Sequence, residues 1–187
     1  MNKHYLRYLI FLWVTFLLSS CATMKSPVTH ENLIHSNEWG IDGKVGIQSP
    51  EVNGSASIIW QQNKDIYNIH FFGPLGLGRV TLNGDDNQVK YIDQYGKIYT
   101  ANSPELLLKQ NLGWDMPISD LIYWIRALPA PDVSSVKNYN ANHQLILLKQ
   151  QGWTINYLEY SENNLPQFMT LNRANIKLKI RINHWIL

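Results

Sequence analysis

Hydrophobic and polar residues alternate one by one along most of the chain from residue 39 onward. The clearest case is segment 176–183, in which isoleucine and leucine alternate with lysine, arginine and asparagine. Segment 39–47 shows the same alternation. Because successive side chains of a strand point to opposite faces, this pattern predicts a sheet with one buried face and one face in water.

The alternation, together with turn-forming residues between the segments, predicts about ten strands. We expect them at 39–47, 55–61, 65–72, 79–83, 88–93, 97–101, 144–149, 153–160, 167–172 and 176–183. The short connections between most of them favour antiparallel pairing, because a parallel crossover needs a dozen or more residues.

Two helices are predicted near the middle of the chain. The first begins at Ser103, which is suited to cap the helix and is followed by a proline and then a glutamate in the first turn. The second is expected to begin near Ser119, to carry an apolar stripe at helical spacing as far as Leu128, and to be stopped by Pro129 and Pro131.

These elements predict a mainly β protein, in which an antiparallel sheet curls around an apolar interior and a helical segment from about 103 to 128 lies across the opening. No internal repeat and no second domain can be recognised, so we expect a single domain over 38–187.

The N-terminal segment has the layout of a secretory signal. Lys3 and Arg7 give a positive start, residues 8–18 are apolar, and small residues precede Cys21, the only cysteine. The apolar stretch is shorter than the roughly 20 residues that a membrane-spanning helix needs. We therefore predict that 1–20 is a signal peptide ending in a lipoprotein cleavage site. An ordinary signal peptide with a chance cysteine near the cut is the alternative.

Cleavage before Cys21 predicts a lipid anchor, with an S-diacylglycerol group on the thiol and an N-palmitoyl group on the new amine. Stable attachment needs two or more chains, since one acyl chain alone binds only marginally. Residues 21–37 are polar and lack an apolar period, so we expect this lipidated N-terminus to act as a flexible tether. Ala22 stands where an aspartate favours retention in the inner membrane of enteric bacteria, which favours the outer membrane here.

Charge and motifs exclude several functional classes. Without Lys3 and Arg7 the formal net charge falls from +2 to zero, and a neutral chain with 16% charged residues is not typical of a nucleic-acid binder. The six histidines show no paired metal-ligand spacing, and no serine lies in a G-x-S-x-G motif. We therefore expect no catalytic residue, no metal and no cofactor.

A glycine-rich segment, 73–78, is unusually apolar for a loop between two strands. Its sequence is GPLGLG, so Leu75 and Leu77 are framed by Gly73, Pro74 and Gly76. One interpretation is that the leucines fold back onto the core. The other is that a leucine projects and contacts lipid, where burying it contributes roughly 1.5–3 kcal/mol, enough for a brief contact but not for an anchor.

The chain closely resembles the LolB family of outer-membrane lipoproteins over nearly its whole length. The resemblance includes the lipoprotein cleavage site at Cys21 and a series of segments in the same order and spacing. These segments are WGIDGK at 39–44, IWQQ at 59–62, GPLG at 73–76, DMPI at 115–118, WIRALP at 124–129 and the strand over 176–185.

The resemblance implies an unclosed half β-barrel of about eleven strands with a helical lid over an apolar cavity. It also implies a receptor that accepts client lipoproteins from a soluble, LolA-like periplasmic carrier and incorporates them into the outer membrane. Leu75 matches the exposed loop leucine linked to membrane insertion, so the loop and the acyl chains on Cys21 would both contact outer-membrane phospholipid. Nucleic acid is not an expected partner, and a monomer is expected.

The acyl chains of a client would occupy the cavity after displacing the lid. By resemblance the functional tryptophans correspond to Trp60, Trp124 and Trp153. The expected cavity residues are Trp60, Tyr67, Ile69, Phe71, Trp124, Ile125 and Trp153. For any one of them an ordinary place in the core is the alternative. Two other functions remain open, a structural lipoprotein with a filled core and a lipid-modifying enzyme, the latter disfavoured by the missing catalytic motifs.

Overall fold

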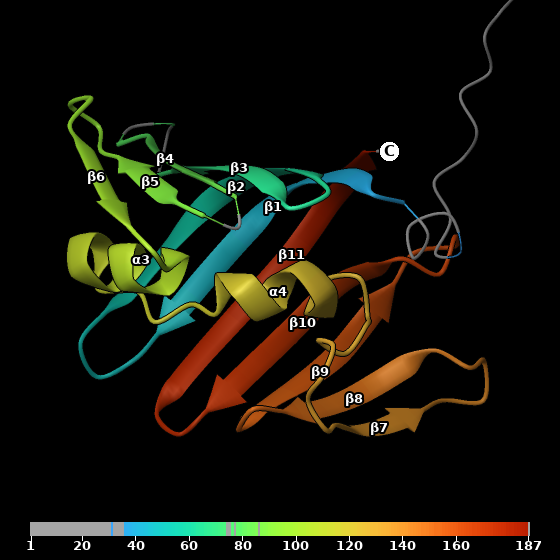
Figure 1. Cartoon of the computed structure of the whole chain (residues 1–187). Helices are drawn as coiled ribbons and strands as arrows, with labels where there is room; N and C mark the ends of the chain where they lie inside the picture. Colours follow the sequence, from blue (N-terminus) through green and yellow to red (C-terminus); the bar gives the residue numbers. More distant parts are fainter. Residues whose placement is uncertain (1–30, 32–35, 74–75, 77, 86, 187) are drawn as a thin grey trace, which may run out of the picture.

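The computed structural model describes residues 31, 36–73, 76, 78–85 and 87–186. Its centre is one antiparallel sheet of eleven strands that does not close into a barrel (Figure 1). The predicted lipidation site at Cys21 lies outside the described residues, as do Pro74, Leu75 and Leu77. The half-barrel architecture is confirmed.

The strands of the first half are β1 (Glu38–Gln48), β2 (Asn53–Asn63), β3 (Ile66–Phe72), β4 (Val80–Gly84), β5 (Val89–Ile92) and β6 (Ile98–Ala101). Two helices follow, α3 (Pro104–Leu112) and α4 (Ile118–Trp124). The second half contains β7 (Val136–Tyr139), β8 (Leu145–Gln150), β9 (Trp153–Tyr160), β10 (Pro166–Arg173) and β11 (Ile176–Ile186).

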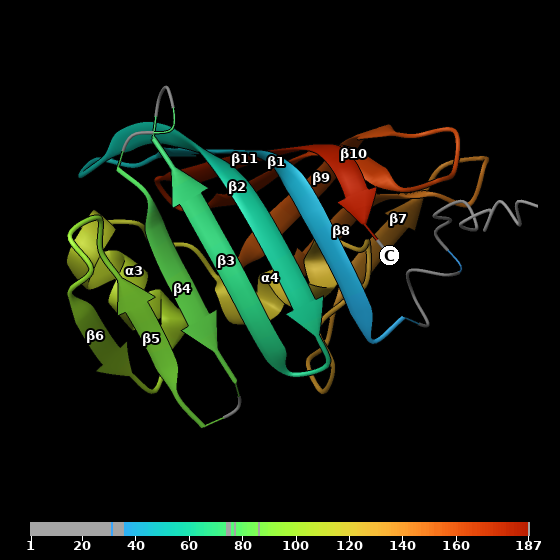
Figure 2. The ribbon, with the colours of Figure 1, turned by 90° about the horizontal axis from the view of Figure 1, so that it is seen from above.

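The order of the strands across the sheet explains where the helices lie. It is β6-β5-β4-β3-β2-β1-β11-β10-β9-β8-β7, so the first and last strands pair at the centre. The segment between β6 and β7 must therefore cross from one edge of the sheet to the other. It carries α3 and α4 across one face, and the sheet curves over them (Figures 1 and 2).

The face that meets the helices is the apolar one. In β11, Leu178, Ile180 and Ile182 are buried, whereas Lys177 and Lys179 between them are exposed. Buried residues of both halves of the sheet and of both helices form one continuous core. The alternation in the sequence thus assigned the buried and exposed faces correctly.

The first helix begins as predicted. Ser103 is its N-cap and accepts the backbone N–H of Leu106 at 3.4 Å, and Pro104 occupies the first turn. At the other end, Gly113 adopts a left-handed φ of 69°, and its N–H donates to the carbonyl of Lys109. Glycine adopts this conformation without a steric cost, so it terminates the helix cleanly.

The second helix ends earlier than predicted. The prediction that it runs to Leu128 is wrong, because α4 ends at Trp124. Ala127 has a left-handed φ of 59° and donates to the carbonyl of Trp124, while Leu128 donates to that of Tyr123. This is the Schellman arrangement, which stops a helix before the prolines are reached.

The strand prediction missed one element. Ten strands were expected from the alternation, and the eleventh, β7, lies at the edge of the sheet with all four residues exposed. A strand with no buried face shows no alternation in its sequence. The count of about eleven that the family resemblance implied is confirmed.

The hairpin between β10 and β11 allows a test of the left-handed backbone conformation of Ala174. Arg173 pairs with Ile176, which leaves a two-residue turn at Ala174 and Asn175, and the exposed Ala174 has φ 47°. We expect Ala174→Gly to raise the free energy of unfolding by about 0.5–1 kcal/mol, because glycine is not strained there. Urea unfolding measures the change. Ala174→Val is the matched control and should lower stability. A glycine variant less stable than wild type would contradict the left-handed conformation assigned to Ala174.

Candidate functional site

All seven predicted cavity residues are buried under or beside the helices. Trp60, Ile69 and Trp124 have no exposed surface, and the other four are 1–6% exposed. All seven belong to the continuous core, in which side chains of α3 and α4 pack against the inner face of the sheet. In this closed arrangement the helices themselves occupy the space in which acyl chains were expected.

The C-terminal end of α4 is attached to the sheet by directional contacts. The Trp124 ring lies 6.3 Å from that of Trp153 on β9, and its indole Nε1–H donates to Oε1 of Gln150 at 2.8 Å. The backbone carbonyl of Trp124 accepts the hydroxyl of Tyr157 at 2.7 Å. Burial raises the pKa of Tyr157 well above its usual value, so this hydroxyl remains a donor.

Gln150 also holds the loop that follows α4. Its Oε1 accepts the N–H of Ala130 at 2.8 Å, and its Nε2 donates to the carbonyls of Ala130 at 2.9 Å and Val133 at 3.0 Å. One buried amide therefore fixes the segment that connects the lid to the β7 edge. Sequence reasoning did not identify Gln150, because its position next to a turn gives no sign of these contacts.

The start of α4 is tied to α3 through a carboxylate. Glu105 accepts the Ser103 hydroxyl at 2.6 Å and the backbone N–H of Ser119 at 2.8 Å. Between the helices, Asp115 pairs with Arg173 at 2.8 Å, and both groups are partly exposed. The contacts at this end of the lid are thus nearer to solvent than those of Gln150.

Trp60 is the centre of a second cluster, on the other side of α4. Its indole donates to Gln62 Oε1 at 3.0 Å, and its ring lies 5.4 Å from that of Trp39. The guanidinium of Arg126 lies over Trp39 at 5.5 Å, and its Nε donates to the carbonyl of Ile122 at 3.0 Å. Burial lowers the pKa of Arg126 from its usual value, but the group stays protonated at neutral pH.

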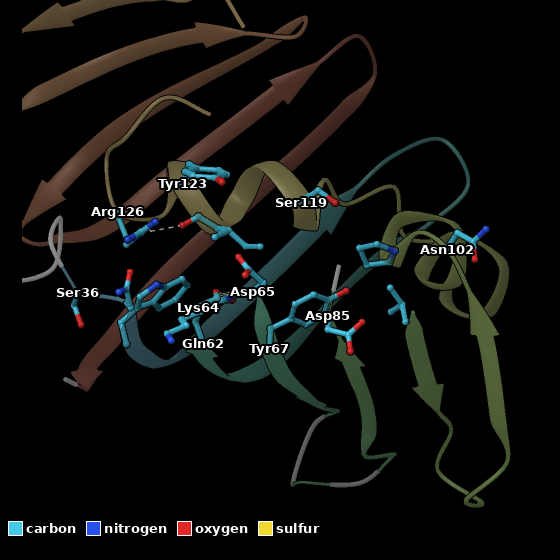
Figure 3. Close-up of a pocket in the computed structure, with 15 residues that line it drawn as sticks. Ser36, Gln62, Lys64, Asp65, Tyr67, Asp85, Asn102, Ser119, Tyr123 and Arg126 are labelled. Carbon is cyan, nitrogen blue, oxygen red and sulfur yellow. Dashed lines mark hydrogen bonds between the residues drawn. The ribbon is translucent and has the colours of Figure 1, made fainter. Parts of the chain in front are cut away.

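A cavity of about 650 Å³ opens beside this cluster (Figure 3). It lies between the last turn of α4, the start of β1, and the turns that follow β2 and β4. Of the predicted cavity residues only Tyr67 lines it, and the side chains around it are mostly polar, including Lys64, Asp65, Asp85 and Arg126. The open cavity is therefore polar, unlike the apolar one that was expected. Trp153 lines a separate pocket of about 370 Å³.

The glycine-rich loop lies at the opposite end of β3 from this cavity. Tyr67 is near the start of the strand, and Gly73 directly follows its end. Gly76 and Gly78 have φ values of 76° and 67°, and the N–H of Gly76 donates to the carbonyl of Gly73 at 3.1 Å. These left-handed positions explain why two glycines are needed. The orientation of the two leucines lies outside the described residues.

In the described part of the chain, no helix has the length and apolar character needed to cross a bilayer. The same residues contain no group of three or more His, Cys, Asp or Glu side chains placed to hold a metal ion.

Comparison with known proteins identifies the family. Residues 37–185 match the family described as "Outer membrane lipoprotein LolB", and this range contains α3, α4 and all eleven strands except the last residue of β11. The chain belongs to this family. Its relatives include the outer-membrane lipoprotein LolB of Pseudomonas paraeruginosa, which is 38% identical over 185 residues and 90% of each chain. The LolB protein of Pseudomonas savastanoi pv. phaseolicola is 35% identical in an alignment 198 positions long, which covers 97% of this chain and 96% of that one.

Solved structures of distant sequence share the fold of the LolB family. A DUF1329 family protein from Desulfovibrio piger has a TM-score of 0.53 at 5% identity and covers 83% of this chain and 88% of its own. A domain from Vibrio parahaemolyticus described as a putative outer membrane lipoprotein-sorting protein also gives 0.53 at 5% identity, with 84% and 91% covered. At this identity the similarity shows the fold alone.

The buried amide of Gln150 allows a test of how the lid is attached. Gln150→Ala should lower the free energy of unfolding by about 2–4 kcal/mol, because it leaves the indole of Trp124 and two backbone groups of Ala130 without partners in the core. Urea denaturation followed by tryptophan fluorescence measures the loss. Gln110→Ala, at an exposed site on α3, is the control and should change stability by less than about 0.5 kcal/mol. Equal effects of the two substitutions would show that Gln150 does not hold the lid.

Proposed function

We propose that this protein accepts lipoproteins from a soluble, LolA-like periplasmic carrier and incorporates them into the outer membrane, to which its own lipidated Cys21 tethers it. The observation that carries the proposal is membership of the LolB family over residues 37–185. The segment that precedes these residues has the sequence of a signal peptide with a lipoprotein cleavage site.

The acyl chains of the client bind between the helices and the concave face of the sheet. Trp60, Ile69 and Phe71 lie on that face, whereas Trp124 and Ile125 belong to α4 and the turn after it. An incoming chain displaces the helical side chains and replaces their contacts with its own. Because dispersion and burial are not directional, broad apolar side chains accept acyl chains of varied length.

Transfer on this scheme makes and breaks no covalent bond. The periplasm has no nucleotide supply, so the client passes from a weaker hold on the carrier to a tighter one here and then to the bilayer. A ligand can shift the lid only by binding the open state better than the closed one. The closed state is already well packed. Client binding must therefore compensate for the helix contacts that are lost and for the conformational entropy that the bound acyl chains lose.

The filled interior also supports a second candidate, a structural outer-membrane lipoprotein that binds no client. A fluorescent fatty-acid analogue distinguishes the two, using the mature chain with Cys21→Ser so that no anchor competes. Saturable binding that quenches tryptophan fluorescence is the expected result, since Trp124 and Trp153 line the proposed path. Absence of saturable binding would exclude the acyl-binding role, and a transfer assay with labelled lipoprotein and purified carrier then tests delivery directly.

The glycine-rich loop is proposed to bring the protein into contact with the membrane during delivery. Leu75→Glu should leave folding and client uptake unchanged but block incorporation, because a carboxylate at the loop tip resists burial in lipid. The client should then accumulate on the variant, which co-purification measures.

Leu77→Glu is the matched control for the loop, since it introduces the same charge two residues away. If Leu75 alone forms the tip, the Leu77 variant delivers normally. Normal delivery by both variants would refute the role of the loop.

A further inference from the structure

Tyr67 has a buried hydroxyl with no hydrogen-bond partner among the described residues. Its side chain is 6% exposed and lines the polar cavity at the end of α4, together with Asp85 (Figure 3). Buried polar groups are nearly always hydrogen-bonded, so this exception needs an explanation, and the adjoining cavity offers room for a partner.

Two other tyrosines of the interior show the usual arrangement. The hydroxyl of Tyr157 donates to the carbonyl of Trp124 at 2.7 Å, and that of Tyr160 donates to the carbonyl of Leu145 at 2.6 Å. Each of these hydroxyls therefore stabilises the fold. The hydroxyl of Tyr67 makes no such contact, so packing of the described residues does not account for it.

The backbone leaves room for the Tyr67 ring. Gly84 on β4 pairs with Tyr67 on β3, and a Cβ atom at Gly84 would lie 2.2 Å from the tyrosine hydroxyl oxygen. Any other residue at this position would displace the ring. The sequence thus places a glycine where the hydroxyl needs space, in a strand where glycine otherwise weakens the sheet.

The charges around the hydroxyl indicate which ligand group fits. Burial raises the pKa of Tyr67, and the nearby carboxylates of Glu105 and Asp85 raise it further, so the hydroxyl is a proton donor at any physiological pH. These two carboxylates, and not the Lys64 and Arg126 side chains that also line the cavity, are the charges that raise its pKa, so an anionic acceptor is disfavoured at the hydroxyl itself. The ligand group must therefore accept a hydrogen bond and carry no negative charge, and a neutral carbonyl oxygen meets both conditions.

The position of Tyr67 along β3 connects this donor with the apolar interior. Tyr67, Ile69 and Phe71 point to the same, buried face of the strand. Tyr67 stands at the cavity, while the other two lie farther along the strand in the core. A ligand with a carbonyl at Tyr67 and a hydrocarbon chain can therefore lie along one continuous strip of the sheet.

We propose that the polar cavity is a subsite for the ester carbonyls at the head of a ligand's acyl chains, and that Tyr67 donates a hydrogen bond to one of them. This inference rests on the proposed function, since it assigns the polar part of the same ligand. It makes Tyr67 a binding residue that distinguishes acyl esters from plain hydrocarbon chains.

The test uses Tyr67→Phe in the mature chain with Cys21→Ser. The probes are a short-chain dioctanoylglyceryl cysteine peptide and its dioctyl ether analogue, which lacks the ester carbonyls. Calorimetric titration should show about 5-fold weaker binding of the ester by the variant, the loss typical of one neutral hydrogen bond, and unchanged binding of the ether. The variant should be at least as stable to urea as the wild type, whereas the control Tyr157→Phe should be less stable.

Unchanged binding of both ester ligands by Tyr67→Phe, the cysteine peptide and the phospholipid named next, or an equal loss for ester and ether, would overturn the subsite while leaving the acyl-binding function intact. If neither probe bound the wild type, the acyl-binding function would fail and the subsite with it. In a second arm of the calorimetric titration, the probe is a short-chain diacyl phosphatidylethanolamine. A loss confined to the cysteine peptide identifies the client lipoprotein as the source of the ester, and a loss confined to the phospholipid identifies membrane lipid.

Discussion

The apolar concave face of an open sheet must be covered, and among the residues that the structure describes one segment, α3 to α4, is placed to cover it. Because β1 and β11 pair at the centre, the two halves of the sheet extend outward in opposite directions and end at β6 and β7. The connection between these edges has to pass over the concave face, and its helices supply the apolar side chains that shield it from water. Burial of this kind is the main favourable term in folding, so fold and lid depend on the same contacts. A ligand that replaces the helices must offer a comparable apolar surface, which hydrocarbon chains do.

The attachments of the lid are unequal, and this bears on the opening that the proposed function requires. At the C-terminal end of α4, Gln150 and Tyr157 hold the main chain and Trp124 through buried hydrogen bonds. At the other end, Glu105 and Asp115 make contacts that are partly open to solvent, where polar contacts contribute less. Motion that begins at α3 and the start of α4, with the end of α4 as the hinge, breaks the weaker contacts first. Breaking the buried amide would leave several polar groups unsatisfied in the core.

Much of the fold could be predicted from the sequence, because one buried face imposes a period of two on each strand. The prediction missed β7, because a strand with no buried residue has no such period. It also misplaced the end of α4, where Ala127 adopts a conformation that usually requires glycine. The seven residues expected to line the cavity are all buried, which an ordinary place in the core also explains. The polar cavity could not be predicted. Lys64, Asp85 and Arg126 come from three separate turns, and no local pattern shows that the strand order brings them together.

The two ends of β3 differ in chemistry, and this gives a bound amphiphile a direction. The polar cavity and the Tyr67 hydroxyl lie at one end, and the glycine-rich loop at the other, with Ile69 and Phe71 between them. Seven residues of strand span about 23 Å, enough to separate the two sites completely. If the head carbonyls of a client lie at Tyr67, its hydrocarbon tails point toward the loop that is proposed to contact the membrane. Delivery then moves the tails from the sheet into lipid with little exposure to water, and the carbonyls leave last, from a site that has kept them hydrogen-bonded until the tails are buried.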